Sequence, residues 1–280
     1  MSEERIEDGD IFFFHRERLF LYADEERADV QRLFMVLAPR GPRPKLRVFV
    51  VGRKRVPRGE EAQPLERAWA VNVLTTREAR AVRRALEGLE AMTRTREMRL
   101  TTTAIPIGAG LYEIVRHQEH TELGYVLAQP DEPGRVQEQL GLRSEASYVV
   151  AVKNPCLPAP GMPTGRSAGY PAKLLEKFGD RRWIAVDDAC LLDHRNAQLV
   201  LIGANARGVE DELGLRVQRD TRFDAFDALH ARRLEQGVRP LFAGVFPDAT
   251  VEEVFDDVDV PLVLTKRPGG APRGFGEVTG

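Results

Sequence analysis

The stretch LRVFVVGRKRVPR, Leu46–Arg58, joins an apolar run to a cationic one. Its first half is rich in Val, Leu and Phe and ends at a glycine, which is typical of a short β-strand. Similar runs bounded by Asp, Pro and Gly lie on both sides of it at Ile11–His15, Gln31–Leu37 and Trp69–Leu74. We therefore predict a meander of strands in the first part of the chain.

The hydrophobic period changes after these strands. In TTREARAVRRALEGLEAM, residues 75–92, apolar side chains recur every three or four positions, which predicts an amphipathic helix capped by Thr76. A second group of strand-like runs follows at Leu111–His117, Thr121–Pro130 and Ser147–Pro155. Between the last two, GRVQEQLG predicts a short helix closed by Gly141.

The order of the second strand group is similar to that of the first. RLFMVLAP resembles LGYVLAQP, and RVFVVGRKRVP resembles YVVAVKNPCLP. Two explanations remain open: related units packed about a pseudo-twofold axis, or independent meanders that share apolar letters. We predict an α+β fold whose β-rich body contains two meander units, duplicated or independent, with flanking helices.

The composition changes beyond the second strand group. CLPAPGMPTGRSAG, residues 156–169, is rich in Pro and Gly and predicts an exposed connection. A helix in PAKLLEKFG and strands in RRWIAV and AQLVLIGA then complete the body. Helices and strands alternate afterwards, which indicates a small α/β unit. We predict a β-rich body over residues 1–204, an α/β appendage over 205–265, and a flexible tail over 266–280.

The overall composition narrows the functional class. The 280 residues include 41 basic and 43 acidic ones, so the net charge is small. The electrostatic field of the whole protein therefore does not favour nucleic acid or a membrane as a partner. No apolar stretch approaches the roughly 20 residues needed to cross a bilayer. The first residues, MSEERIEDGD, are polar, and Cys156 and Cys190 are the two cysteines. We expect a cytoplasmic protein with reduced thiols.

Charge is uneven along the chain. Between Arg40 and Arg58 there are eight basic residues and no acidic one, whereas Glu210–Asp259 is dominated by Asp and Glu. The candidate binding residues follow the strand quoted above: Arg53, Lys54, Arg55 and Arg58. They form either a surface for an anionic partner or a solvated strand end that prevents edge pairing.

The candidate partner of the basic residues is an acidic protein surface or a nucleic acid. Nucleic-acid binding needs several cations on one side of the protein, facing the same phosphate backbone. Successive side chains of a strand point to opposite faces, so nucleic acid is not favoured. The acidic last quarter suggests self-association, in which that quarter docks on the basic surface of the same chain or of a second copy.

A metal-dependent hydrolase is the alternative function. RHQEH places His117 and His120 three positions apart, a spacing that a helix or a hairpin tip would bring together. His194, which follows Asp193, is the best third ligand. A polar hairpin end is the competing explanation for the first two histidines.

Other catalytic patterns are incomplete. GRSAG matches a nucleophile elbow around Ser167, but the Pro-rich segment before it does not form the required strand. LVLIGANARG has Asn205 where a dinucleotide fingerprint needs its second glycine. Neither cysteine has a His or CxxC neighbour. We expect no cofactor and a role that is more consistent with binding than with catalysis.

The segments DVQRLFMVL, VVGRKRVP, SYVVAVKNP and LLDHRNAQLVLIGA resemble a group of prokaryotic proteins to which no activity is assigned. The resemblance covers about Gly9–Ala204 and implies that this part forms one unit. It transfers no catalytic residue. We therefore predict a non-enzymatic binding or assembly protein.

Overall fold

The computed structural model describes residues 3–18, 29–42, 44–52, 55–57, 67–87, 90–92, 98–100, 102–117, 120–159, 162, 167–203 and 226–236. The strands are β1 (Glu3–Arg18), β2 (Asp29–Pro39), β3 (Leu46–Val51), β4 (Arg67–Thr76), β5 (Glu90–Met92), β6 (Met98–Leu100), β7 (Ile105–His117), β8 (His120–Gln129), β9 (Glu145–Lys153), β10 (Trp183–Ala185) and β11 (Gln198–Gly203). The helices are α1 (Ala79–Leu86), α2 (Arg135–Gln139), α3 (Ala172–Glu176), α5 (Phe226–Gln236) and the 3-10 helix η3 (Ala189–Leu192).

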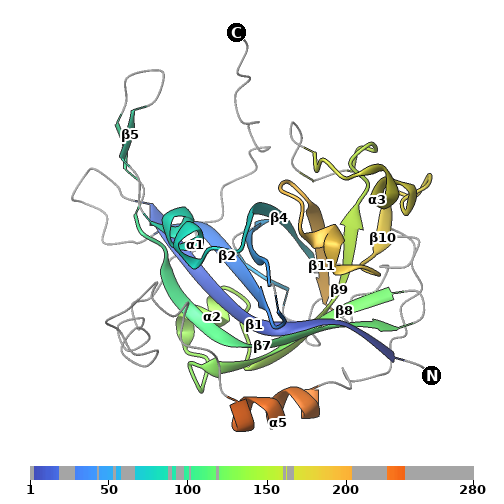
Figure 1. Ribbon diagram of the computed structural model, residues 1–280. Helices are drawn as coiled ribbons and strands as arrows, with labels where there is room; N and C mark the ends of the chain where they lie inside the picture. The colour runs from blue at the N-terminus through green and yellow to red at the C-terminus, as the bar shows by residue number, and fades with distance from the viewer. Residues whose placement is uncertain are drawn as a thin grey trace.

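Most of the described strands form a closed antiparallel barrel, and β5 pairs with β6 in a separate two-stranded sheet. The main sheet has the order β10-β9-β11-β4-β3-β2-β1-β7-β8, and β8 also pairs with β9, which closes the sheet on itself. β9 therefore has β11 on one side and both β8 and β10 on the other. Eight strands make the barrel, and β10 extends it at the end of β9 (Figure 1).

The predicted α+β body of two meander units is wrong, although the predicted strands are confirmed at their positions. The first half of the barrel is β1 to β4, and the second half is β7, β8, β9 and β11. These halves share one sheet because β1 pairs with β7 and β4 pairs with β11. The joining pairs are distant in sequence, as in Val71 with Gln198, so local periodicity does not reveal them.

Large side chains fill the barrel interior. The fully buried ones include three tyrosines and two phenylalanines from five different strands: Tyr112, Tyr125, Tyr148, Phe13 and Phe49. Burial of one such side chain contributes about 1.5–3 kcal/mol to folding. The described strands thus fill the barrel interior with large side chains.

Short segments cover both ends of the barrel. At one end, α2 places Val136 and Leu140 in the core, and Gln137 donates a hydrogen bond to the Ile107 carbonyl at 3.0 Å. At the other end, the Asn72 amide of β4 donates to the carbonyl of Leu192 in η3 at 2.7 Å. Both segments are fixed to strand ends by buried polar contacts.

Two glycines are required by close backbone approach. Gly141 ends α2 with φ +80°, as predicted, and a Cβ there would lie 2.2 Å from the Val56 carbonyl oxygen. Gly110 of β7 lies at a register shift against β8, and a Cβ there would lie 2.1 Å from the Val126 carbonyl oxygen. Such bulges bend a strand and help a sheet to curve into a barrel.

Helix α1 packs on the outer face of the sheet, where it contacts β3 and β4 and shares an apolar cluster with side chains of β1 and β2. Its Val82 and Leu86 pack against the outward phenylalanines Phe12 and Phe34. Arg16 of β1 donates to three carbonyls at the end of α1, the nearest being that of Leu86 at 2.9 Å. The helix is shorter than predicted at both ends. It begins at Ala79, beyond the proposed Thr76 cap, and ends at Leu86, while Glu90–Met92 of the predicted helix form β5.

Helix α5 packs against the outer side of β7 and β8, where it is drawn in orange below the barrel (Figure 1). It lies within FDAFDALHARRLEQG, residues 223–237, the stretch of the appendage that the sequence predicts as a helix. The rest of that appendage and the predicted tail lie outside the described residues. None of the described helices is long and apolar enough to span a membrane.

A charged network occupies one end of the barrel interior. Arg47 is 3% exposed and donates to Glu7 at 2.6 Å and to Asp193 at 2.7 Å. Tyr112 donates its hydroxyl to the same Glu7 carboxylate at 2.6 Å, and Lys45 reaches Asp193 at 2.6 Å. Burial disfavours the charge of Arg47, but the carboxylates outweigh burial and raise its pKa.

We expect Arg47→Met to destabilise the fold by about 3–5 kcal/mol, because it removes the cation that the buried Glu7 carboxylate contacts and one of the two cations at Asp193. The measurement is urea unfolding at pH 7. Arg83→Met is the matched control, since the Arg83–Glu87 pair is exposed and should change stability by less than about 1 kcal/mol. Equal effects of the two substitutions would contradict the assigned role of the network.

A second prediction concerns acid stability. His15 is 2% exposed, and burial lowers its pKa from 6.5 to about 4. The unfolded chain therefore takes up a proton at His15 before the folded one does, and stability is lost as the pH falls from 6.5 to 4. The shift corresponds to about 3 kcal/mol. His15→Leu should remove this part of the pH dependence, measured as the difference in unfolding free energy between pH 7 and pH 4. An unchanged difference would show that other groups cause the acid sensitivity.

Candidate functional site

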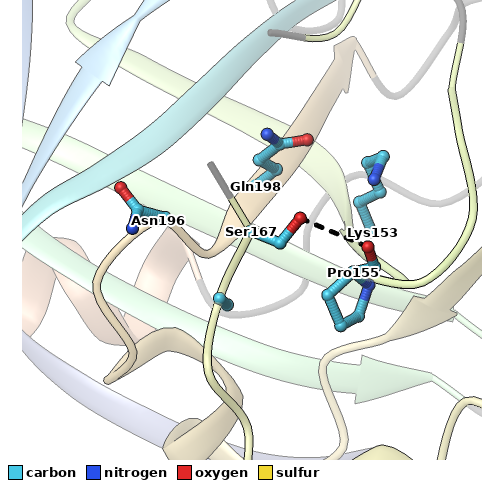
Figure 2. Close-up of a pocket in the computed structure, with 6 residues that line it drawn as sticks. Lys153, Pro155, Ser167, Asn196 and Gln198 are labelled. Atoms are coloured by element: carbon cyan, nitrogen blue, oxygen red, sulfur yellow. Dashed lines mark hydrogen bonds between the residues drawn. The ribbon is translucent and has the colours of Figure 1, made fainter. Parts of the chain in front are cut away.

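A small pocket lies on the outer wall of the barrel, next to the connection that follows β9. Its volume is about 10 Å³. Six residues from three segments line it: Lys153, Pro155, Ser167, Ala168, Asn196 and Gln198. Figure 2 shows Lys153, Ser167 and Gln198 arranged around a common space.

Strand alternation places two polar residues on this wall. Val152 of β9 pairs with Leu199 of β11, and both face the interior core. Lys153 and Gln198, the next positions along these strands, therefore belong to the outer face. On that face the connection adds Met162 to a separate apolar cluster. The pocket thus forms where the connection crosses β9 and β11.

Lys153 is a buried cation without a carboxylate partner within the described part of the chain. The residue is 9% exposed, and its Nζ donates to the Asn154 carbonyl at 3.1 Å. Burial lowers the pKa of its ammonium group. The buried cation Arg47, by contrast, contacts two carboxylates.

The other polar groups of the pocket are a hydroxyl and two carboxamides. The Ser167 hydroxyl donates to the Pro155 carbonyl at 3.3 Å, as the dashed line in Figure 2 shows. Asn196 lies in a turn before β11 with φ 68°. Gln198 is 6% exposed. None of the described residues that line the pocket is acidic, so its chemistry suits an anion.

The residues predicted as a basic surface are only partly described. Arg53, Lys54 and Arg58 lie outside the described residues, while Arg55 is half-buried. That surface therefore stays a prediction.

Three other members of the same basic run contact carboxylates. Arg40 donates to Asp10 at 2.8 Å, and Lys45 and Arg47 converge on Asp193. Three of the eight positive charges in this run are therefore neutralised within the protein.

We hypothesised that acidic residues of the last quarter dock on a basic surface, but the described part of that quarter contacts the barrel through basic residues. Helix α5 docks through Arg232 and Arg233, which contact carboxylates of the barrel. In this helix the cations belong to the last quarter and the anions to the barrel.

The structure brings together two of the three candidate metal ligands. His117 pairs with His120 across the turn between β7 and β8, and their rings stack with centroids 5.2 Å apart. His120 Nε2 also lies 3.2 Å from Glu122 Oε1. His194 instead packs edge-on against Tyr170, at 4.8 Å between centroids. Among the described residues there is no group of three or more His, Cys, Asp or Glu side chains placed to hold a metal.

Three of the pocket residues, Lys153, Asn196 and Gln198, were missed by sequence reasoning. A usable signal was present in SYVVAVKNP, where a lysine ends an otherwise apolar strand. Its outward position and its neighbour Gln198 depend on the pairing of β9 with β11, which the sequence does not show. Ser167 was considered only as a nucleophile.

Comparison with protein-family models, with curated proteins and with solved structures finds no match.

Proposed function

We propose that the chain is a non-enzymatic binding or assembly protein that captures an anionic group of a partner at Lys153. The observation that carries this proposal is the burial of the Lys153 residue, whose ammonium has a backbone carbonyl as its acceptor within the described residues. A buried cation costs free energy unless it is paired with an anion. A ligand carboxylate or phosphate would supply the missing negative charge.

The pocket volume limits what can enter. A cavity of about 10 Å³ accommodates a group the size of one water molecule. One oxygen of a carboxylate fits such a space, and the remainder of the ligand would stay on the outer wall. This favours an acidic side chain or terminal carboxylate of a protein partner over a small metabolite enclosed by the fold.

The hydrogen bonds of the pocket support binding rather than nucleophilic catalysis. The Ser167 hydroxyl donates to the Pro155 carbonyl, and the Lys153 amine donates to a different carbonyl, that of Asn154. An activated serine would instead donate to a base. Hydroxyl, carboxamide and ammonium groups in this arrangement are suitable donors for an anion.

We predict that Lys153→Met lowers the affinity for an acidic peptide by about 10- to 100-fold, because a charge-assisted hydrogen bond contributes about 1.5–3 kcal/mol. The measurement is fluorescence anisotropy of a labelled peptide that ends in Glu-Glu. Lys173→Met is the matched control, since Lys173 is exposed on α3. Equal affinities of the two variants would contradict the proposal, and tighter binding of a phosphorylated oligonucleotide than of the peptide would identify a nucleic acid as the partner.

The pH dependence of binding provides a second prediction. Burial lowers the pKa of Lys153, and an anion binds the protonated form. Affinity should therefore be constant at neutral pH and fall as the pH rises through the lowered pKa, at a pH below that of an ordinary lysine. Anisotropy titrations between pH 7 and pH 10 measure this fall. A fall that is the same in Lys153→Met would assign it to another group.

A further inference from the structure

Among the side chains of α5 that the structure describes, most of those that contact the barrel are charged or polar. Its Leu229 is fully buried against Leu111, Val115 and Val126 of the barrel. Its Leu234, by contrast, is 83% exposed. A surface helix usually buries a continuous apolar stripe, and an isolated helix of 11 residues is marginal in water. The polar contacts therefore contribute, together with Leu229, to the position of α5 on the barrel.

The polar contacts of α5 converge on carboxylates from several strands. Arg232 donates to Asp8 of β1 at 2.7 Å and to Glu113 of β7 at 2.8 Å. His230 Nε2 lies 2.7 Å from a carboxylate oxygen of Glu145 in β9. Asp8, Glu113 and Glu145 are called the acidic face below.

Arg233 adds two contacts at the edge of the acidic face. It donates to the Leu127 carbonyl at 2.7 Å and to the Asp131 carboxylate at 2.8 Å. Arg40 of the barrel contacts Gln236 at the end of α5. Polar contacts between α5 and the barrel therefore extend from His230 to Gln236, at and beside the acidic face.

The acidic face belongs to the barrel and does not depend on the chain connection to α5. Asp8 and Glu113 lie on neighbouring strands at paired positions, and Glu145 begins β9. Residues 204–225 separate β11 from α5, and a segment of that length spans up to about 75 Å when extended. An α5 helix from another copy would make the same contacts on this face.

We infer that the acidic face is a docking site for α5 of a second copy, so that two chains associate by exchanging this helix. Exchange of an identical element preserves every contact that the monomer makes. A chain's own α5 competes at an effective concentration of about millimolar, which keeps the exchanged dimer weak in the native protein. The ionic contacts make the exchange sensitive to salt.

The test uses two full-length charge-reversed variants. One carries Arg232→Glu and Arg233→Glu, and the other carries Asp8→Lys and Glu113→Lys. In each variant the helix and the face of the same chain carry charges of the same sign, so the helix no longer docks on its own chain. In an equimolar mixture the helix of each copy is complementary to the face of the other.

The mixture should form a heterodimer with a dissociation constant at least tenfold below that of the native dimer, measured by sedimentation equilibrium in 50 mM salt. A chain that carries all four substitutions is the matched control, because complementarity in cis is restored and it should behave like the native protein. The inference would be overturned if the dissociation constant of the mixture were no lower than that of the native dimer. It would also be overturned if the heterodimer persisted in 1 M NaCl.

A second measurement avoids charge reversal and its effect on folding. In a Cys156→Ser, Cys190→Ser background, a His230→Cys chain is mixed with a Glu145→Cys chain and treated with a short bis-maleimide. Crosslinked heterodimers whose yield rises with protein concentration are expected. Reaction products that remain monomeric at millimolar protein would overturn the inference even if the charge-reversed variants unfold.

Discussion

The pairing of β9 with three other strands is the constraint on which the rest of the structure depends. β9 bonds to β11 on one side and, on the other, to β8 and then β10. Without its pairing to β8 the sheet would be open, with two long edges whose backbone groups are unpaired. The closure also fixes the pocket, because Lys153 ends β9 and Gln198 begins the neighbouring β11.

Charge is used differently inside and outside this barrel. In the interior, Arg47 contacts two largely buried carboxylates, those of Glu7 and Asp193, and Lys45 also contacts Asp193. On the outer wall, Arg232 makes a similar fork to Asp8 and Glu113, but it is partly exposed and belongs to a helix beyond the barrel. Lys153 lies between these cases, since it is buried like the first and has only a carbonyl acceptor within the described residues. These differences distinguish a structural network, a docked helix and a candidate ligand site.

The sequence allowed accurate prediction of individual elements but not of their assembly. Runs such as Leu46–Gly52 and Thr121–Pro130 are strands because their apolar, β-branched residues suit a pleated and buried surface. Gly141 ended its helix as expected because only a residue without a Cβ fits its conformation there. Closure was not predictable, because the pairs that produce it have no local pattern. For the same reason Arg47, which reads as part of a basic surface run, could not be assigned to the interior, and Lys153 could not be connected with Gln198.

The distance along the chain between the closing partners has a consequence for how quickly the protein folds. β4 meets β11 through Val71 and Gln198, and β1 meets β7 through pairs such as Glu3 with His117. Each pairing has to close a long loop, and the conformational entropy of that loop is lost before the contacts of the pairing can compensate for it. All-β topologies of this kind reach the native state in milliseconds to seconds, far more slowly than helical bundles of similar stability. We therefore expect the pairing between the two four-stranded halves to form more slowly than the pairing of neighbouring strands within each half.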